Sequence, residues 1–331
     1  MDGAWKRWMA AVILSVLLPR MIVNIGSRRQ LHQPQGVETA GSAATAPLSS
    51  PSQSPEEAIW IPVLMPDGTV EPMELERYVF GVVLAEMPAS FETEALKAQA
   101  VAARTYALRR LTLGDRHSSG TVCTESTCCQ AWMSDEDYLS QRGTRKDWSR
   151  IRLAVGQTAG QVLTYNGSLA ETTYFSCSGG RTEDALAVWG EEIPYLQSVD
   201  SPGEEQASVY RQQVEFTAAE FAAALGRSLT GVPSDWLGPV TKTPGGGVAT
   251  MVIAGITYSG TELRRLLSLH STSFTMSAGD GRITVTTLGN GHRVGLSQYG
   301  ADAMAVGGSS YADILAHYYR GTKIDKFSDL G

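Results

Sequence analysis

The sequence Leu84-Ala85-Glu86-Met87-Pro88 marks the end of one predicted helix and is followed closely by a second, which includes Glu94–Tyr106. Residues 78–84 are apolar, and Pro88 stops the first helix because its ring clashes with the preceding turn. Glu86 is therefore a lone carboxylate among apolar residues at a junction of two helices. Such surroundings raise the pKa of a carboxyl group and let it donate a proton near neutral pH. A capping or salt-bridged glutamate is the alternative interpretation.

The second helix carries polar side chains on an alanine-rich backbone. Lys97 and Arg104 are seven residues apart, so they lie on the same face and point toward solvent or into a cleft. Gln99 and Tyr106 are also on this helix, where they either bind a ligand or pack against a neighbouring element.

Composition indicates an ordinary globular protein. The chain has 331 residues, enough for one large domain or two smaller ones, with 43% hydrophobic and 18% charged residues. Its net charge is -7, from 27 basic and 34 acidic residues, and no long basic run is present. This argues against a nucleic-acid partner, because phosphates require clustered lysine and arginine.

The N-terminal segment predicts export. Lys6 and Arg7 precede an apolar run that ends near residue 25, which is typical of an export signal and places the rest of the chain outside the cytoplasm. We expect residues 1–25 to be a retained membrane anchor, with a cleaved peptide as the alternative. Residues 26–58 are rich in Ser, Ala, Gln, Pro and Gly and predict a flexible linker, followed by an extracytoplasmic domain over 59–331.

Helices and hairpins alternate along the rest of the chain, which predicts an α+β fold with antiparallel strands around a substrate cleft. About 206–288 forms a β-α-β-β subdomain or insertion. The predicted hairpins or strands are 59–70, 160–176, 250–258 and 273–288; the helices are 75–86, 92–111, 135–153, 261–269 and 311–318; a strand and helix share 209–225.

Three of the four cysteines lie close together with a histidine. The pattern His117-x5-Cys123-x4-Cys128-Cys129 offers four zinc ligands on one irregular loop. Outside the cytoplasm an even number of cysteines also suits disulfides. The spacing leaves both interpretations open. Cys177 is outside the pattern and is expected to be a small buried hydrophobic residue.

Several motifs together resemble the stage II sporulation protein D family, over about residues 74–324. They are Leu84-Ala85-Glu86-Met87-Pro88, the helix Leu96–Tyr106, Ser178-Gly179-Gly180-x-Thr182-Glu183, Val188-Trp189-Gly190, Gly291-His292-x-Val294-Gly295-x-Ser297-Gln298-Tyr299-Gly300, His317-Tyr318-Tyr319-x-Gly321-Thr322 and the amino-terminal anchor.

The resemblance implies a membrane-anchored lytic transglycosylase that cuts peptidoglycan glycan strands, without stem peptides, while the mother cell engulfs the forespore. The implied partners are the amidase stage II sporulation protein P and the membrane protein M, and the implied location is the mother-cell membrane, facing the intermembrane space. Glu86 corresponds to the catalytic glutamate. One carboxyl group suffices, because the C6 hydroxyl of the muramic acid replaces water as the nucleophile and yields a 1,6-anhydro end.

The resemblance also assigns supporting residues. It implies that substrate contacts come from Lys97, Gln99, Arg104, Tyr106, Ser178, Gly179, His292 and Gln298. Arg293 stands where many relatives have glycine. A structural zinc is associated with some members, whose histidine, cysteine and cysteine match His117, Cys123 and Cys129, while Cys128 replaces a histidine; no organic cofactor is implied.

Two other functions remain alternatives. Related domains occur in amidase enhancers, so the chain is alternatively a non-catalytic peptidoglycan-binding module that activates an amidase. A cysteine nucleophile, Cys177 or Cys129 with His292 or His117, is the weaker alternative, because no spacing between base and cysteine supports it.

Overall fold

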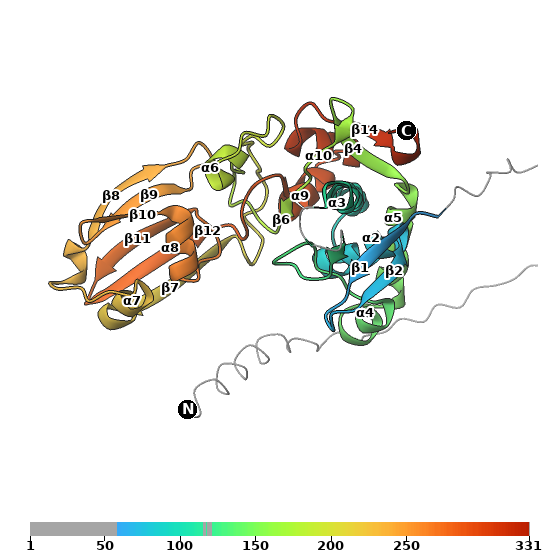
Figure 1. The fold of residues 1–331 in the computed structure, drawn as a ribbon. Coiled ribbons are helices and arrows are strands. Elements are labelled where there is room, and N and C mark those ends of the chain that lie inside the picture. Colours follow the sequence, from blue (N-terminus) through green and yellow to red (C-terminus); the bar gives the residue numbers. More distant parts are fainter. Residues whose placement is uncertain (1–57, 115–116, 118–120, 331) are drawn as a thin grey trace, which may run out of the picture. The chain divides into compact units, whose positions relative to one another are not determined.

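The computed structural model describes residues 58–114, 117 and 121–330 (Figure 1). The predicted anchor 1–25, and the predicted linker up to residue 57, lie outside the described residues. Within the described part, no helix combines the length and apolarity that a membrane crossing requires.

Two consecutive helices position the Glu86 junction. Helix α2 (Leu75–Glu86) ends where the N–H of Met87 donates to the carbonyl of Val83, directly before the proline. Helix α3 (Thr93–Leu113) follows and ends at Gly114, whose φ of 64° closes the last turn. Alanines cover much of α3, so that neighbouring elements approach closely, and most of its residues are buried.

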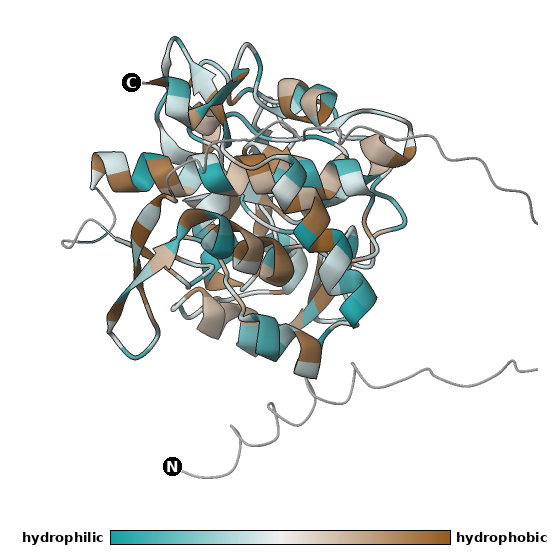
Figure 2. Ribbon diagram, turned by 90° about the vertical axis from the view of Figure 1, so that its right-hand side faces the viewer, coloured by the Kyte–Doolittle hydropathy of each residue, from teal (hydrophilic) through white to brown (hydrophobic). Residues whose placement is uncertain are grey.

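The first hydrophobic core surrounds α3. Around it pack α2, α5 (Arg145–Gln157), α9 (Gln298–Val306) and α10 (Tyr311–Tyr318). Helices here carry both hydrophobic and hydrophilic residues, as expected for elements that bury one face (Figure 2). Three small sheets complete this region: β2-β1-β3, β14-β4-β5 and the parallel pair β13-β6. Their strands are β1 (Trp60–Leu64), β2 (Val70–Glu74), β3 (Val122–Cys123), β4 (Gln161–Tyr165), β5 (Ser168–Leu169), β6 (Tyr174–Phe175), β13 (Leu296–Ser297) and β14 (Lys323–Lys326).

A second hydrophobic core falls inside the 206–288 segment. Its centre includes Phe221, Trp236, Ile253 and Val285. Two antiparallel sheets, β11-β12-β7 and β10-β9-β8, enclose it, with two short helices (Figure 1). The elements are β7 (Arg211–Thr217), α7 (Ala218–Ala224), β8 (Leu237–Lys242), β9 (Val248–Ile253), β10 (Ile256–Ser259), α8 (Gly260–Leu266), β11 (Phe274–Gly279) and β12 (Arg282–Leu288).

The α+β prediction is confirmed, with helices beside mostly antiparallel sheets. Three local predictions are wrong. The helix predicted for 135–153 is divided into α4 (Asp135–Gln141) and α5, because Thr144 and Asp147 cap each other and begin a new helix. The strand predicted for 250–258 turns at Ala254-Gly255 and becomes β9 and β10.

The hairpin predicted for 160–176 is the third. The Asn166-Gly167 turn joins β4 and β5 as expected, but β6 leaves this sheet and pairs with β13. This change places Phe175 beside Ser297, next to the start of α9.

Candidate functional site

Glu86 lies at the wall of an open pocket of about 620 Å³. Its Oε1 accepts a hydrogen bond from the backbone N–H of Ala131 at 2.9 Å, and its Oε2 accepts one from Nε2 of Gln298 at 3.4 Å. Tyr138 and Arg142 line the same pocket. Distant parts of the chain thus hold the carboxyl group of Glu86 from two sides, and Glu86 is itself a lining residue of the pocket.

Burial raises the pKa of Glu86, and this effect exceeds the opposing effects of the Ala131 and Gln298 hydrogen bonds and the positive charge of Arg142. The proton is therefore retained to a higher pH than on an exposed glutamate. A fixed carboxyl group with a raised pKa at a pocket wall can act as a general acid.

A tyrosine pair and a glutamine form a polar network next to this carboxyl. The hydroxyl of Tyr174 donates to Oε1 of Gln130 at 2.9 Å, and Nε2 of Gln130 reaches the Tyr78 hydroxyl at 3.4 Å. Burial, followed by the charge of Glu86, raises the pKa of Tyr174 well above its ordinary value. Tyr174 therefore remains a neutral hydroxyl beside Glu86.

His292 contacts the rings of Phe175, at 5.5 Å between centroids, and Trp189, at 5.7 Å. Its Nδ1 accepts the backbone N–H of Val294 at 3.1 Å. Burial lowers the pKa of His292 to about 4, with a further contribution from Arg264, while the backbone of Tyr174 acts in the opposite direction. The ring is neutral at physiological pH and serves as a packing and hydrogen-bonding group.

Arg104 lies away from the Glu86 pocket, although the resemblance implied a substrate contact. It is fully buried, and its Nε and Nη2 bind the carboxylate of Glu76 at 2.7 and 2.6 Å. Its Nη1 donates to the carbonyl of Gln161 at 3.0 Å. These contacts join α2, α3 and β4, which favours a structural role.

The other three predicted residues on α3 are also engaged or enclosed. Lys97 pairs with Glu94 at 2.7 Å. Gln99 is fully buried, and within the described residues neither polar atom of its side chain has a hydrogen-bond partner. The Tyr106 hydroxyl donates to the carbonyl of Cys128 at 3.5 Å. Their roles in substrate binding stay predictions.

Ser178 and Gly179 bind an internal carboxylate. Oε2 of the buried Glu204 accepts hydrogen bonds from the Ser178 hydroxyl at 2.7 Å and from the N–H groups of Ser178 and Gly179, both at 2.9 Å. Cys177 adds its Sγ at 3.3 Å, and burial raises the pKa of its thiol to about 12. The glycine-rich turn thus holds Glu204 in place, and the thiol of Cys177 is not poised to be a nucleophile.

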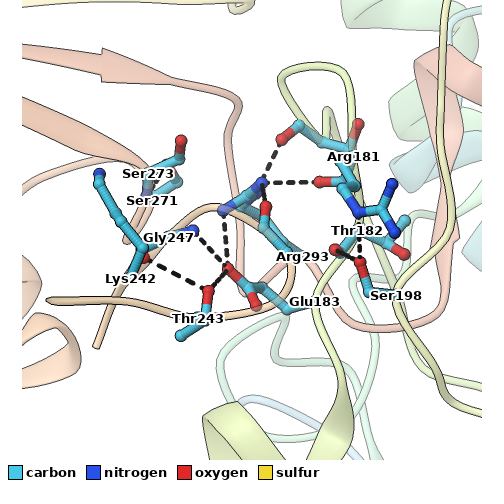
Figure 3. A network of polar contacts seen from close by, with 12 residues as sticks. Arg181, Thr182, Glu183, Ser198, Lys242, Thr243, Gly247, Ser271, Ser273 and Arg293 are labelled. Carbon is cyan, nitrogen blue, oxygen red and sulfur yellow. Dashed lines mark hydrogen bonds and ion pairs between the residues drawn. The ribbon is translucent and has the colours of Figure 1, made fainter.

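Arg293 is buried in a polar network between the 178–183 segment and the loop that precedes β9 (Figure 3). Its guanidinium donates to the carbonyls of Ser178, Arg181 and Gly245, and it pairs with Glu183 at 3.0 Å. The extra side chain at a position where glycine was expected therefore fastens two loops, at a left-handed φ of 69°.

His117, Cys123, Cys128 and Cys129 form one cluster, whose ligand atoms all lie within 4.8 Å of one another. Nε2 of His117 is 3.6 Å from Sγ of both Cys128 and Cys129. Tetrahedral zinc with ordinary bond lengths requires about 3.6 Å between nitrogen and sulfur ligands. The four cysteines are free thiols in this structure. The geometry therefore fits a metal ion with four protein ligands, which has no open position and would be structural.

The metal-binding loop continues directly into the Glu86 site. Ala131, whose N–H holds Glu86, is two residues after Cys129. The Tyr78 hydroxyl also donates to the carbonyl of Cys123 at 3.2 Å, which ties the loop to α2. A bound metal would fix the segment that orients the carboxyl group.

Several neighbours of Glu86 were not predicted from the sequence, because they are distant in the sequence and only the fold brings them close. Ala131 acts through its backbone, which no residue pattern indicates. Arg142 follows α4, and its Nη1 donates to the carbonyl of Ala85 at 2.8 Å. Tyr174 was assigned to a hairpin rather than to the β6–β13 pair. The helix break at Thr144 could have been found from its capping pattern.

Comparison with known proteins settles the family. A family model described as "Stage II sporulation protein" matches residues 67–165. The chain is 40% identical to stage II sporulation protein D of Bacillus subtilis over 89% of both chains, and 37% identical to that of Bacillus amyloliquefaciens over 95% of this chain and 93% of the relative. The chain belongs to the stage II sporulation protein D family.

A more distant relative is the amidase enhancer of Bacillus subtilis, 30% identical over 75% of this chain and 40% of the enhancer. The chain is thus also similar, at lower identity, to a protein named for an effect on an amidase.

Proposed function

We propose that the protein is a lytic transglycosylase that cleaves the glycan strands of peptidoglycan during sporulation, with Glu86 as the general acid and base. The observation that carries this proposal is the setting of Glu86: a carboxyl group with a raised pKa, held by Ala131 and Gln298 at the wall of an open pocket. Family membership supports the cell-wall role in sporulation.

The proposed reaction needs one titrating group. Protonated Glu86 gives its proton to the glycosidic oxygen as the bond from that oxygen to C1 breaks. The resulting carboxylate then takes the proton of the C6 hydroxyl, whose oxygen bonds to C1 and closes the 1,6-anhydro ring. The Ala131 N–H and the Gln298 amide stabilise the carboxylate between these two steps.

Asp147 lines the same pocket and is the carboxylate that ordinary hydrolysis would use. Its Oδ2 accepts hydrogen bonds from the backbone N–H and the hydroxyl of Thr144, at 3.0 and 2.7 Å, and these bonds lower its pKa. The Asp147 carboxylate is therefore engaged in capping α5, which disfavours a role in activating water.

The test is digestion of purified glycan strands by the full-length chain and two variants. We expect anhydro-ended fragments from the unaltered chain and from Asp147→Asn, and none from Glu86→Gln. Asp147→Asn is a matched control, because it removes one charge from the same pocket and keeps an oxygen that can cap Thr144. If the unaltered chain instead produced reducing ends, and Asp147→Asn did not, the protein would be a hydrolase that uses Asp147.

The remaining features of the proposal follow from the resemblance. They are a retained anchor in the mother-cell membrane, strands without stem peptides as substrate, stage II sporulation proteins P and M as partners, and zinc in the cluster around Cys129. The amidase-enhancer relative favours one other candidate function, that of a non-catalytic module that binds peptidoglycan and activates an amidase. Binding of strands without any cleavage product would support that candidate.

A further inference from the structure

Trp189 is an exposed aromatic residue that no step of the proposed reaction uses. It is the last residue of α6 (Ala185–Trp189), and 43% of its surface is exposed. Gly190 ends the helix in a left-handed conformation with a φ of 77°, so the backbone turns away directly after Trp189. Single exposed hydrophobic residues are common on protein surfaces, so the contacts of the indole, rather than its exposure, indicate a role.

The indole rests on a rigid base. The ring of His292 lies 5.7 Å from it, tilted by 53°, and itself meets the buried ring of Phe175 edge-on at 5.5 Å. The His292 ring is fixed in turn by the N–H of Val294. Trp189 therefore packs against a ring that is itself anchored, while part of the indole surface stays in water.

This cluster of Trp189, His292 and Phe175 includes a residue of the strand pair that also positions a hydrogen-bond donor to Glu86. Phe175 of β6 is paired with Ser297 of β13, and Gln298, the next residue, donates to Glu86. Burial, followed by the nearby charge of Glu86, raises the pKa of Tyr174, the other residue of β6. The exposed indole of Trp189 and the carboxyl group of Glu86 are thus both supported by residues of, or next to, the β6–β13 pair.

The surroundings of the indole indicate the kind of ligand. Glu191 and Glu192, which follow Gly190, are both exposed. Their two negative charges, against the single positive charge of Arg264 that acts on His292, disfavour an anionic ligand at this place. A pyranose ring is uncharged, and its C–H groups form an apolar face that matches the electron-rich face of an indole.

We propose that Trp189 is a stacking platform for an uncharged pyranose ring of the glycan strand, at a subsite away from the bond that Glu86 cleaves. This inference rests on the proposed function, since it names a further binding residue for the same strand. The platform increases affinity for strands long enough to reach both residues, and it takes no part in proton transfer.

The experiment measures strand binding in the full-length chain that carries Glu86→Gln, so that the strand stays intact. The probes are purified glycan strands without stem peptides, sorted by length. Adding Trp189→Ala or Trp189→Leu is expected to weaken binding of long strands by about tenfold, or about 1.4 kcal/mol, while the shortest strands bind as before. Trp189→Phe retains most of the affinity. With Glu86 intact, Trp189→Leu raises KM and leaves kcat nearly unchanged.

Trp60→Ala is the matched control, because Trp60 is also an exposed tryptophan, 64% exposed on β1, and its removal should not change binding. Trp189→Leu keeps an apolar cover over His292, so its unfolding temperature should match that of the parent even if Trp189→Ala is destabilised. Equal affinity of Trp189→Leu and the parent for long strands overturns the platform, whereas anhydro products from the chain with Glu86 would still stand. Conversely, a platform effect without any cleavage would overturn the proposed function alone.

Discussion

Replacement of Arg104 by methionine is expected to destabilise the fold and to leave substrate binding unchanged. Methionine keeps much of the apolar stem and removes the guanidinium. That group makes two hydrogen bonds with Glu76, at 2.7 and 2.6 Å, one with the carbonyl of Gln161, at 3.0 Å, and a longer one with the carbonyl of Ala100, at 3.4 Å. Arg104 is fully buried, and without it Glu76 keeps the hydrogen bond that its Oε1 accepts from the backbone N–H of Gly160 at 3.1 Å but loses both bonds from the guanidinium.

The magnitude follows from the burial of the two partners. Removing one member of a buried ion pair costs about 3–5 kcal/mol. The Glu76 side chain is 30% exposed, so water solvates part of its orphaned charge. We therefore expect about 3 kcal/mol, at the lower end of that range. At about 2–4 °C per kcal/mol for a domain of this size, the unfolding temperature falls by roughly 6–12 °C.

The assay is denaturant unfolding of the parent, Arg104→Met, Glu76→Leu and the double variant. Since an apolar pair often replaces a buried ion pair at little cost, the double variant should recover at least about 1 kcal/mol relative to the sum of the single changes. The folded fraction of Arg104→Met should keep the parental KM. Unchanged stability together with a raised KM would refute this reasoning and make Arg104 a substrate-binding residue.

Three further changes test other parts of the site. Arg142→Gln removes the positive charge that lowers the pKa of Glu86, so the alkaline limb of the pH–rate profile should move to higher pH; a move to lower pH would contradict the assignment of the acid. Metal analysis of the purified chain should find about one zinc ion, lost in Cys129→Ser together with thermal stability; equal metal content in both would exclude the cluster as the ligand set. Gly81→Ala should cost about 1–3 kcal/mol, because its methyl group would collide with an indole, whereas Gly156→Ala on α5 meets open space and should not destabilise; equal effects would contradict the packing.

Helices with strong local signals could be predicted to the residue. The apolar run and Pro88 predicted α2, and both α2 and α10 have the predicted bounds, 75–86 and 311–318. In the structure a capping box of Ser310 and Asp313 begins α10 before its apolar face. Local chemistry decided these elements. The same chemistry was overlooked at Thr144, where a capping box divides the predicted long helix, and at Ala254-Gly255, where two residues with positive φ make a hairpin turn.

The site could be predicted only in part, since its contacts join distant segments. Glu86 and Gln298 are 212 residues apart. The local sequence indicated Glu86, whereas only the resemblance indicated Gln298. Ser178 was expected to face a ligand, but its partner is Glu204, whose approach depends on how the loop folds. Likewise Lys97 and Arg104 both lie on α3 with the predicted spacing, but the packing of α3 against other elements, which the spacing does not reveal, buries Arg104.

Cleavage in water enriched in the heavy oxygen isotope tests the central claim most directly. When Glu86 donates a proton and the C6 hydroxyl attacks C1, the new sugar end contains no oxygen from water, so mass spectrometry should find anhydro ends without label, and no products from Glu86→Gln. Labelled reducing ends, or undiminished cleavage by Glu86→Gln, would contradict the account.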